Sequence, residues 1–172
     1  MSDFAHRLQL DQIRDGDRLD LVADDAERAA IAERLDLAGL DRLDAHAMLN
    51  RDGDAIRAQG RVQASLEQSC VVTGEPIPAH VDEAFEILFR PEPGPGDEAI
   101  ELGAEECDVV FHDGAAIDLG SAIADTLALS LDPYPRSAGA EAALKEAGIM
   151  SEEEASPFAV LAQLKRGEGD KP

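Results

Sequence analysis

The sequence predicts an α+β fold, in which helices pack on one face of a mainly antiparallel sheet of about five or six strands. Three observations support this prediction. Apolar and polar residues alternate over residues 56–67, as expected for a strand buried on one side. The turn sequences Asp52-Gly53 and Gly74-Glu75-Pro76 bound this strand. Apolar residues recur at helical spacing after Asp118, which supplies a cover for the buried side of the sheet.

The first fifty residues predict two strands and a helix. Alternation predicts a short strand over residues 4–10 and a longer strand over residues 43–49, just before the Asp-Gly turn. Between them, Asp24 or Asp25 is placed to cap a helix. The modest apolar stripe expected for this helix consists of Ala26, Ala30 and Leu35. These elements would form the amino-terminal part of the sheet and one covering helix.

The chain after Pro76 predicts two more strands and a second helix. A strand over residues 79–90 is followed by an acidic Pro/Gly-rich loop at residues 91–106 and a short apolar strand at residues 107–111. Asp118 is expected to cap a helix, because apolar residues recur every four positions from Leu119 to Leu131. Pro133 and Pro135 cannot continue that helix.

Two parts of the chain are expected. Residues 1–136 form the sheet-and-helix core domain, and residues 137–172 form a partly helical extension with a frayed end. The extension holds a short helix at residues 141–147 and a last helix that begins with Ser156 as cap and Pro157 at its first position. In the last helix, Phe158, Leu161 and Leu164 would share a face.

The charge balance disfavours some partners and favours others. The chain has 37 acidic residues against 15 Lys and Arg, for a formal net charge of -22. No Lys or Arg lies between Pro91 and Pro135, where eleven residues are acidic. Since nucleic-acid affinity comes largely from Lys and Arg that displace counterions, this chain is ill suited to grip RNA. The same charge attracts basic proteins, although acidity that only maintains solubility is an alternative explanation.

The remaining motifs point to a cytoplasmic protein without catalytic chemistry. Cys70 and Cys107 are too few for a disulfide framework, so a reducing compartment is expected. The sequence shows no signal peptide and no apolar run near the roughly 20 residues of a membrane span. It also lacks a Gly-rich phosphate loop, a nucleophile elbow and a metalloprotease helix. We therefore expect no enzyme activity, cofactor, membrane contact or small-molecule substrate.

Cys70 continues the apolar alternation beyond Leu66, so we expect it to be buried and to pack as a small hydrophobic residue. Two alternatives stay open. A reactive thiol would need a basic or helix-amino-terminal environment, which the neighbouring sequence does not offer. A zinc site would need about four ligands. The conceivable set is Cys70, His80, Cys107 and His112, and its spacing matches no zinc knuckle or ribbon.

Three segments together resemble the bacterial YceD family, described as large ribosomal RNA subunit accumulation proteins. They are the turn "CVVTGEP" (residues 70–76), the helix exit "LALSLDPYPR" (residues 127–136) and the tail "PFAVLAQLK" (residues 157–165). The resemblance runs from about Phe4 to Lys165. It implies a role in making or stabilising the large ribosomal RNA, hence in ribosome assembly. Family genes commonly neighbour that of a small basic large-subunit ribosomal protein, and the family brings no established catalytic residues.

The turn departs from the family pattern at one position. Many members have Cys-x-x-Cys there, whereas this chain has Cys70 at the first position and Thr73 at the second. The resemblance therefore does not imply a zinc knuckle for this chain. The family-motif residues of the turn are Cys70, Thr73, Gly74, Glu75 and Pro76.

We expect a non-enzymatic factor in large ribosomal subunit assembly or large rRNA accumulation. Its expected partner is a basic large-subunit ribosomal protein or a pre-ribosomal particle. The expected partner-binding residues are Glu92, Asp97, Glu98, Glu101, Glu105, Glu106, Asp108, Arg136, Pro157, Phe158 and Leu161. Arg136 is expected to pair with the acidic surface, with a phosphate contact as the alternative. The tail helix is expected to dock on its own domain or in a partner's groove.

Two alternative functions remain at this stage. One is direct rRNA binding or RNA processing through Arg57 and Arg61, which share a strand face but lack the stacking aromatics of single-strand binders. The other is a small acidic interaction domain unrelated to ribosomes.

Overall fold

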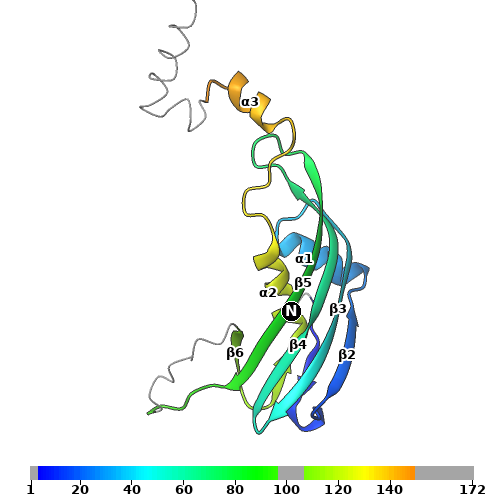
Figure 1. Cartoon of the computed structure of the whole chain (residues 1–172), viewed down its shortest axis with the longest axis vertical. Helices are drawn as coiled ribbons and strands as arrows, with labels where there is room; N and C mark the ends of the chain where they lie inside the picture. Colours follow the sequence, from blue (N-terminus) through cyan, green and yellow to red (C-terminus); the bar gives the residue numbers. More distant parts are fainter. Residues whose placement is uncertain (1–3, 97–106, 150–172) are drawn as a thin grey trace, which may run out of the picture.

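The computed structural model describes residues 4–96 and 107–149. A five-stranded sheet with strand order β2-β3-β4-β5-β6 forms the body of the molecule (Figure 1). Its strands are β2 (Asp17–Val22), β3 (Gly39–Asp52), β4 (Ala55–Ser69), β5 (Pro76–Pro91) and β6 (Asp108–His112). Neighbouring strands are antiparallel except β5 and β6, which are parallel. The predicted α+β class and the mainly antiparallel sheet are confirmed.

A second, two-stranded sheet and the helices complete the described fold. β1 (Arg7–Gln9) pairs antiparallel with β7 (Ala116–Asp118), and a short 3₁₀ helix, η1, covers Leu10–Gln12. The described residues form the α-helices α1 (Asp25–Arg34), α2 (Leu119–Ser130) and α3 (Ala140–Glu146). In Figure 1, α1 and α2 lie along the curved sheet and α3 lies beyond one end of it. The three helices predicted within the described residues are confirmed to within a few residues at each end.

The β3–β4 and β4–β5 hairpins follow the alternation in the sequence. The predicted apolar face of β4 is buried at Ile56, Ala58, Val62, Ala64 and Leu66. Gly53 turns the first hairpin with φ +62, a conformation that glycine adopts without strain. Gly60 allows close strand packing, because a Cβ atom there would lie 1.8 Å from the His46 carbonyl oxygen.

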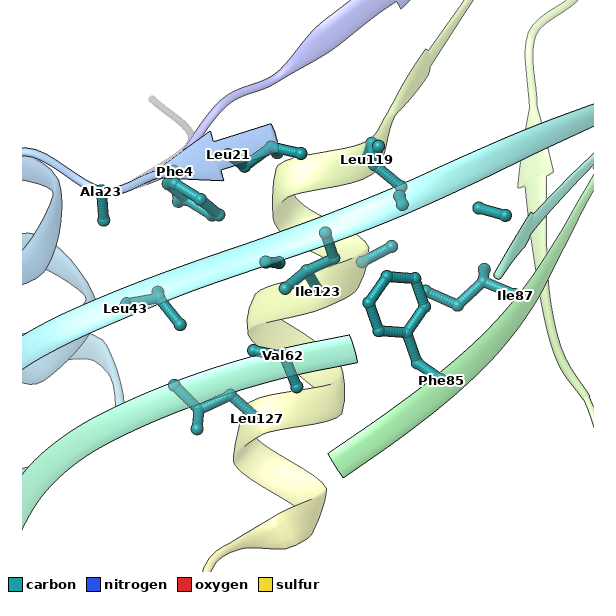
Figure 2. Close-up of a cluster of buried hydrophobic side chains, with 14 of the residues drawn as sticks. Phe4, Leu21, Ala23, Leu43, Val62, Phe85, Ile87, Leu119, Ile123 and Leu127 are labelled. Carbon is teal, nitrogen blue, oxygen red and sulfur yellow. The ribbon is translucent and has the colours of Figure 1, made fainter. Parts of the chain in front are cut away.

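The core lies between the sheet and α2. Leu119, Ile123 and Leu127 of α2 are completely buried. They face side chains of β4 and β5, among them Val62 and Phe85 (Figure 2). Burying one such aliphatic side chain contributes about 1.5–3 kcal/mol, so α2 anchors the chain that follows β6.

Helix starts use the predicted caps. The Asp24 carboxylate accepts a hydrogen bond from the Glu27 backbone N–H, and the Glu27 side chain accepts one from the Asp24 N–H, which forms a capping box. The Asp118 carboxylate accepts from the Ser121 N–H at 3.0 Å and starts α2. α2 ends at Ser130, before the two prolines that were expected to stop it.

The amino-terminal predictions need three corrections. The strand predicted for residues 4–10 is only Arg7–Gln9, because Leu10 already belongs to η1. β2 and β7 were not predicted, and β7, with three residues, is too short to show a period. The stripe predicted for α1 is wrong at Ala26, which is exposed, and it lacks Ile31, which is buried; Leu35 does pack against the core. The packing of α1 against β3 decides which side of this weakly amphipathic helix faces inward.

The described chain continues past the predicted domain boundary. α3 begins four residues after Arg136, and the division at residues 136 and 137 stays a prediction. The last predicted helix falls in residues 150–172, which lie outside the described residues.

Candidate functional site

β6 is an edge strand that exposes apolar side chains. Within the described residues its paired neighbour is β5 alone. Val110 is 36% exposed and Phe111 is 52% exposed. Sheet edges offer unpaired backbone groups, and proteins usually protect them with charge or a cover. An edge that carries exposed apolar side chains is therefore a candidate interaction site.

Carboxylates surround this edge. Val110 and Phe111 border a hollow of about 290 Å³ whose lining includes Asp113 and Asp125, with Arg7 as the one cation of the lining. Glu92 and Asp108 lie at the end of β5 and the start of β6, and the Glu92 N–H donates to the His112 carbonyl at 3.1 Å. We name this surface the acidic edge and define it as Glu92, Asp108, Val110, Phe111, Asp113 and Asp125.

Asp113 is held ionised mainly by backbone amides. Its Oδ1 accepts from the Ala115 N–H at 2.9 Å and the Ala116 N–H at 3.3 Å. These bonds lower the pKa of Asp113, and the Arg7 guanidinium adds a smaller effect in the same direction. Arg7 and Asp113 are both largely exposed and 3.7 Å apart, so their pairing is weak. The carboxylate keeps its charge without a close cation.

Asp118 and Asp125 of the same hollow have partners in other elements. Asp118 accepts from the Ser121 N–H and also from the His6 N–H at 3.3 Å. It therefore joins the start of α2 to the amino-terminal segment. Asp125, about two turns into α2, forms an ion pair with Arg34 of α1.

His112, considered from the sequence as a zinc ligand, makes hydrogen bonds that join parts of the fold. Its Nδ1 accepts from the Gly114 N–H at 3.0 Å, so its Nε2 carries the proton and donates to the Asp54 carbonyl at 2.9 Å. The neutral, buried ring thus joins the end of β6 to the β3–β4 turn. No group of three His, Cys, Asp or Glu among residues 4–96 and 107–149 could hold a metal ion.

The Cys70 turn is a second feature with unusual chemistry. Cys70 is 4% exposed, as its place in the alternation predicts. Its Sγ accepts from the Thr73 N–H at 3.4 Å and from the Ser137 N–H at 3.3 Å. Burial raises the pKa of the thiol, but the hydrogen bonds from Ser137 and Thr73 lower it to about 6. The sequence around the turn gave no sign of these donors, because Ser137 lies 67 positions away.

The predicted partner-binding residues do not lie together in the structure. The structure brings Glu92 and Asp108 to the acidic edge, whereas Arg136 lies in the connection between α2 and α3. Arg136 is exposed and forms no ion pair with a described residue, and its pairing with the acidic surface stays a prediction. The predicted residues that lie outside the described part are Asp97, Glu98, Glu101, Glu105, Glu106, Pro157, Phe158 and Leu161.

The open face of the sheet, opposite the helices, holds the arginines proposed for RNA. Arg57 of β4 pairs with Glu86 of β5, and Arg61 pairs with Asp82 at 2.7 Å. The hydrogen bond from Arg61 lowers the pKa of Asp82. Each of these arginines already has a carboxylate partner on the neighbouring strand.

Together these features define a small acidic α+β protein with an exposed apolar and carboxylate-rich sheet edge. No helix in the described residues is both long and apolar enough to cross a membrane. The chain belongs to the YceD family. The family model, described as large ribosomal RNA subunit accumulation protein YceD, matches residues 58–165, more than half of the chain. Comparisons with curated proteins and with solved structures gave no match.

The match confirms the family predicted from the sequence, over a shorter range than predicted. It includes β5, β6, β7, α2 and α3, and it begins within β4, so it does not extend to Phe4. The description assigns the family to accumulation of the large ribosomal RNA subunit and names no catalytic activity.

Proposed function

We propose that this protein is a non-enzymatic factor in large ribosomal subunit assembly that contacts a basic ribosomal protein or a pre-ribosomal particle. The observation that carries the proposal is the acidic edge. It places exposed apolar side chains beside carboxylates in a segment, from Pro91 to Pro135, that contains no Lys or Arg. The family's description supplies the link to the large ribosomal subunit.

The charge of the edge favours a cationic partner. Asp113 is hydrogen bonded by uncharged amides, and its ion pair with the exposed Arg7 is weak, so its negative charge is only partly offset. The sequence adds five more carboxylates to the same segment between residues 97 and 106. A field of one sign raises the encounter rate with an oppositely charged partner by about 10- to 1000-fold at low salt, and salt weakens it.

The apolar part of the edge supports binding after the encounter. Aromatic side chains near the centre of an interface commonly carry much of the binding energy, and Phe111 is the large exposed aromatic of this surface. An extended basic segment could also form backbone hydrogen bonds with the side of β6 that pairs with no described strand. In this proposal the carboxylates attract the basic partner, and Val110 and Phe111 contribute most of the binding energy once it is bound.

Cross-linking tests this function directly. Purified full-length protein would be cross-linked to pre-ribosomal particles separated on a gradient, and the products read by mass spectrometry. We expect cross-links from the segment around β6 to a basic large-subunit protein. Cross-links to RNA alone, or protein cross-links confined to the open face, would contradict the proposal.

One observation favours a second candidate, direct RNA contact. Phe111 lies opposite Arg90 in the β5–β6 register, so both occupy the open side of the sheet. Arg90 forms no ion pair with a described residue. An aromatic ring beside a guanidinium is a stacking element of single-strand binders. Phe111→Ala would then weaken RNA binding without changing the binding of basic proteins to the carboxylates.

A further inference from the structure

A groove lies at the other end of the molecule from the β3–β4 turn, where three segments distant in sequence meet. Its volume is about 340 Å³. Leu35 and Leu37 line one wall, Val71 lines another, and Leu131, Pro133 and Pro135 line the third. We name it the exit groove, because α2 ends there.

Backbone hydrogen bonds fix the walls relative to one another. The Val71 N–H donates to the Pro135 carbonyl at 2.9 Å, and the Gln68 side chain donates to the Asp132 carbonyl at 2.9 Å. Next to Leu37, the Ala38 N–H donates to the Glu67 carbonyl of β4 at 2.8 Å. The groove is therefore preformed in the folded domain.

The lining specifies an amphipathic occupant with positive charge. Val71 is 54% exposed, although its side chain is apolar. The charged residues of the lining are Asp36 and Asp132, both acidic. A segment that fits would place apolar side chains in the groove and Lys or Arg near these two carboxylates.

The chain's own carboxy-terminal segment has this pattern. Phe158, Leu161 and Leu164 recur at three-residue spacing, which places them on one side of a helix. Lys165 and Arg166 follow directly. A helix of this length is marginal in water unless its apolar side is covered.

The last described residues lie close enough to the exit groove for the following segment to reach it. Ser137, whose N–H contacts the thiol of Cys70, lies next to Val71 of the groove and three residues before α3. α3 has seven residues and is about 10 Å long. It ends in a Schellman motif, with the Ile149 N–H on the Leu144 carbonyl and Gly148 at φ +75, which turns the chain. Pro157 lies eight positions after Ile149, a stretch that spans up to about 28 Å.

We propose that the exit groove is the docking site of the chain's own segment 157–166. Phe158, Leu161 and Leu164 enter the apolar groove, and Lys165 and Arg166 approach Asp36 and Asp132. The contact is intramolecular and needs no ribosomal partner. It also makes the groove unavailable to other amphipathic basic segments until the tail is displaced.

Amide NMR of the full-length chain tests the contact. The tail variant Phe158→Asp/Leu161→Asp should shift the resonances of Val71 and Leu131, because the groove becomes empty. The matched control Ala159→Asp/Gln163→Asp adds the same charge on the other side of the segment and should leave these resonances unchanged. Equal shifts from both variants, or none from either, would overturn the proposal.

A synthetic fluorescein-labelled peptide of residues 155–168 provides the second measurement. A tethered segment has an effective concentration near the millimolar range, so the wild-type groove should compete with the peptide. Fluorescence anisotropy should show about tenfold tighter binding to the full-length Phe158→Asp/Leu161→Asp variant than to wild type. Adding Val71→Asp to that variant should abolish binding, whereas adding Leu129→Asp, at an exposed residue outside the groove lining, should not.

Sedimentation distinguishes docking within one chain from docking between copies. The wild-type chain should sediment as a monomer over the concentrations used for NMR. A dimer that disappears in Phe158→Asp/Leu161→Asp would show that the tail enters a second copy, and it would overturn the intramolecular contact. Equal peptide affinity for wild type and the tail variant would do the same.

Discussion

On the open face of the sheet, Asp82 is held mainly by an arginine, whereas on the acidic edge Asp113 is held mainly by backbone amides. Asp82 has Arg61 as its partner at 2.7 Å. Asp113 has the amides of Ala115 and Ala116, with Arg7 at 3.7 Å. Both environments lower a carboxyl pKa, but only the first does so mainly through a cation.

This difference explains how a chain with twelve arginines can present a surface suited to cations. Arg57 and Arg61 are held by carboxylates of β5 and contribute little net positive field. On the acidic edge, Asp125 pairs with Arg34, whereas Asp113 is held mainly by uncharged donors. The number of charged residues alone does not reveal this difference in partners, since both the open face and the acidic edge are rich in acidic residues.

The largest expected effect concerns the packing that supports the acidic edge. Gly120 of α2 is buried, and a Cβ atom there would lie 1.8 Å from the Phe4 carbonyl oxygen. Gly120→Ala should therefore destabilise the protein by about 2–3 kcal/mol, as measured by urea unfolding. Gly139→Ala is the control, because its nearest neighbour is a side-chain atom at 4.0 Å. Equal stability of the two variants would show that the amino-terminal segment does not cross α2 this closely.

The next effect concerns the cap at the edge. Asp118→Ala removes hydrogen bonds to the Ser121 and His6 amides, and should cost about 1–2 kcal/mol. Thermal unfolding would measure the loss. Asp125→Ala removes an exposed carboxylate about two turns further along α2 and should cost less than about 1 kcal/mol. A larger cost for Asp125→Ala would reverse the roles given to the two carboxylates.

A smaller effect is expected on the open face. Arg57→Ala and Arg61→Ala remove partly exposed ion pairs, each worth about 0.2–1 kcal/mol. The double variant should bind a basic ribosomal protein as well as wild type does, since the arginines are not part of the acidic edge. Urea unfolding and anisotropy would measure the two quantities. Loss of large-rRNA binding in this variant would favour the RNA-binding alternative.

The smallest effect is a change in titration. Arg61→Ala should raise the pKa of Asp82 toward the ordinary value, because the Arg61 hydrogen bond is the main cause that lowers it. Arg7→Ala should leave the pKa of Asp113 low, since the amides of Ala115 and Ala116 remain. Carboxyl ¹³C NMR across acidic pH would report both values. A pKa of Asp113 that rises as far as that of Asp82 would remove the distinction between the two regions.

The sequence predicted what depends on long periodic patterns. The alternation over residues 56–66 identified β4 and placed Cys70 among the buried residues. Asp118 and the four-residue spacing after it identified α2. Periodicity did not predict β7, which is too short to show a period. It also did not predict the burial of Ile31, which depends on where α1 meets β3.

The candidate site was predicted less completely than the fold. Composition identified the acidic segment but not its place beside β6 at the sheet edge. The parallel pairing of β6 with β5 leaves Phe111 exposed, and no local pattern indicates that pairing. The contacts of Ser137 with Cys70 and of His112 with Asp54 join residues 67 and 58 positions apart. Such contacts follow from tertiary packing, which a single sequence does not show.

Competitive binding at physiological ionic strength tests the central claim most directly. Immobilised full-length protein would be offered purified large-subunit ribosomal proteins and, separately, a transcript of the large ribosomal RNA, at about 0.15 M salt. We expect retention of basic proteins, at least tenfold weaker for Glu92→Lys/Asp108→Lys and unchanged for the control Asp20→Lys/Asp41→Lys. Tight binding of the bare transcript, with no retained ribosomal protein, would contradict the account.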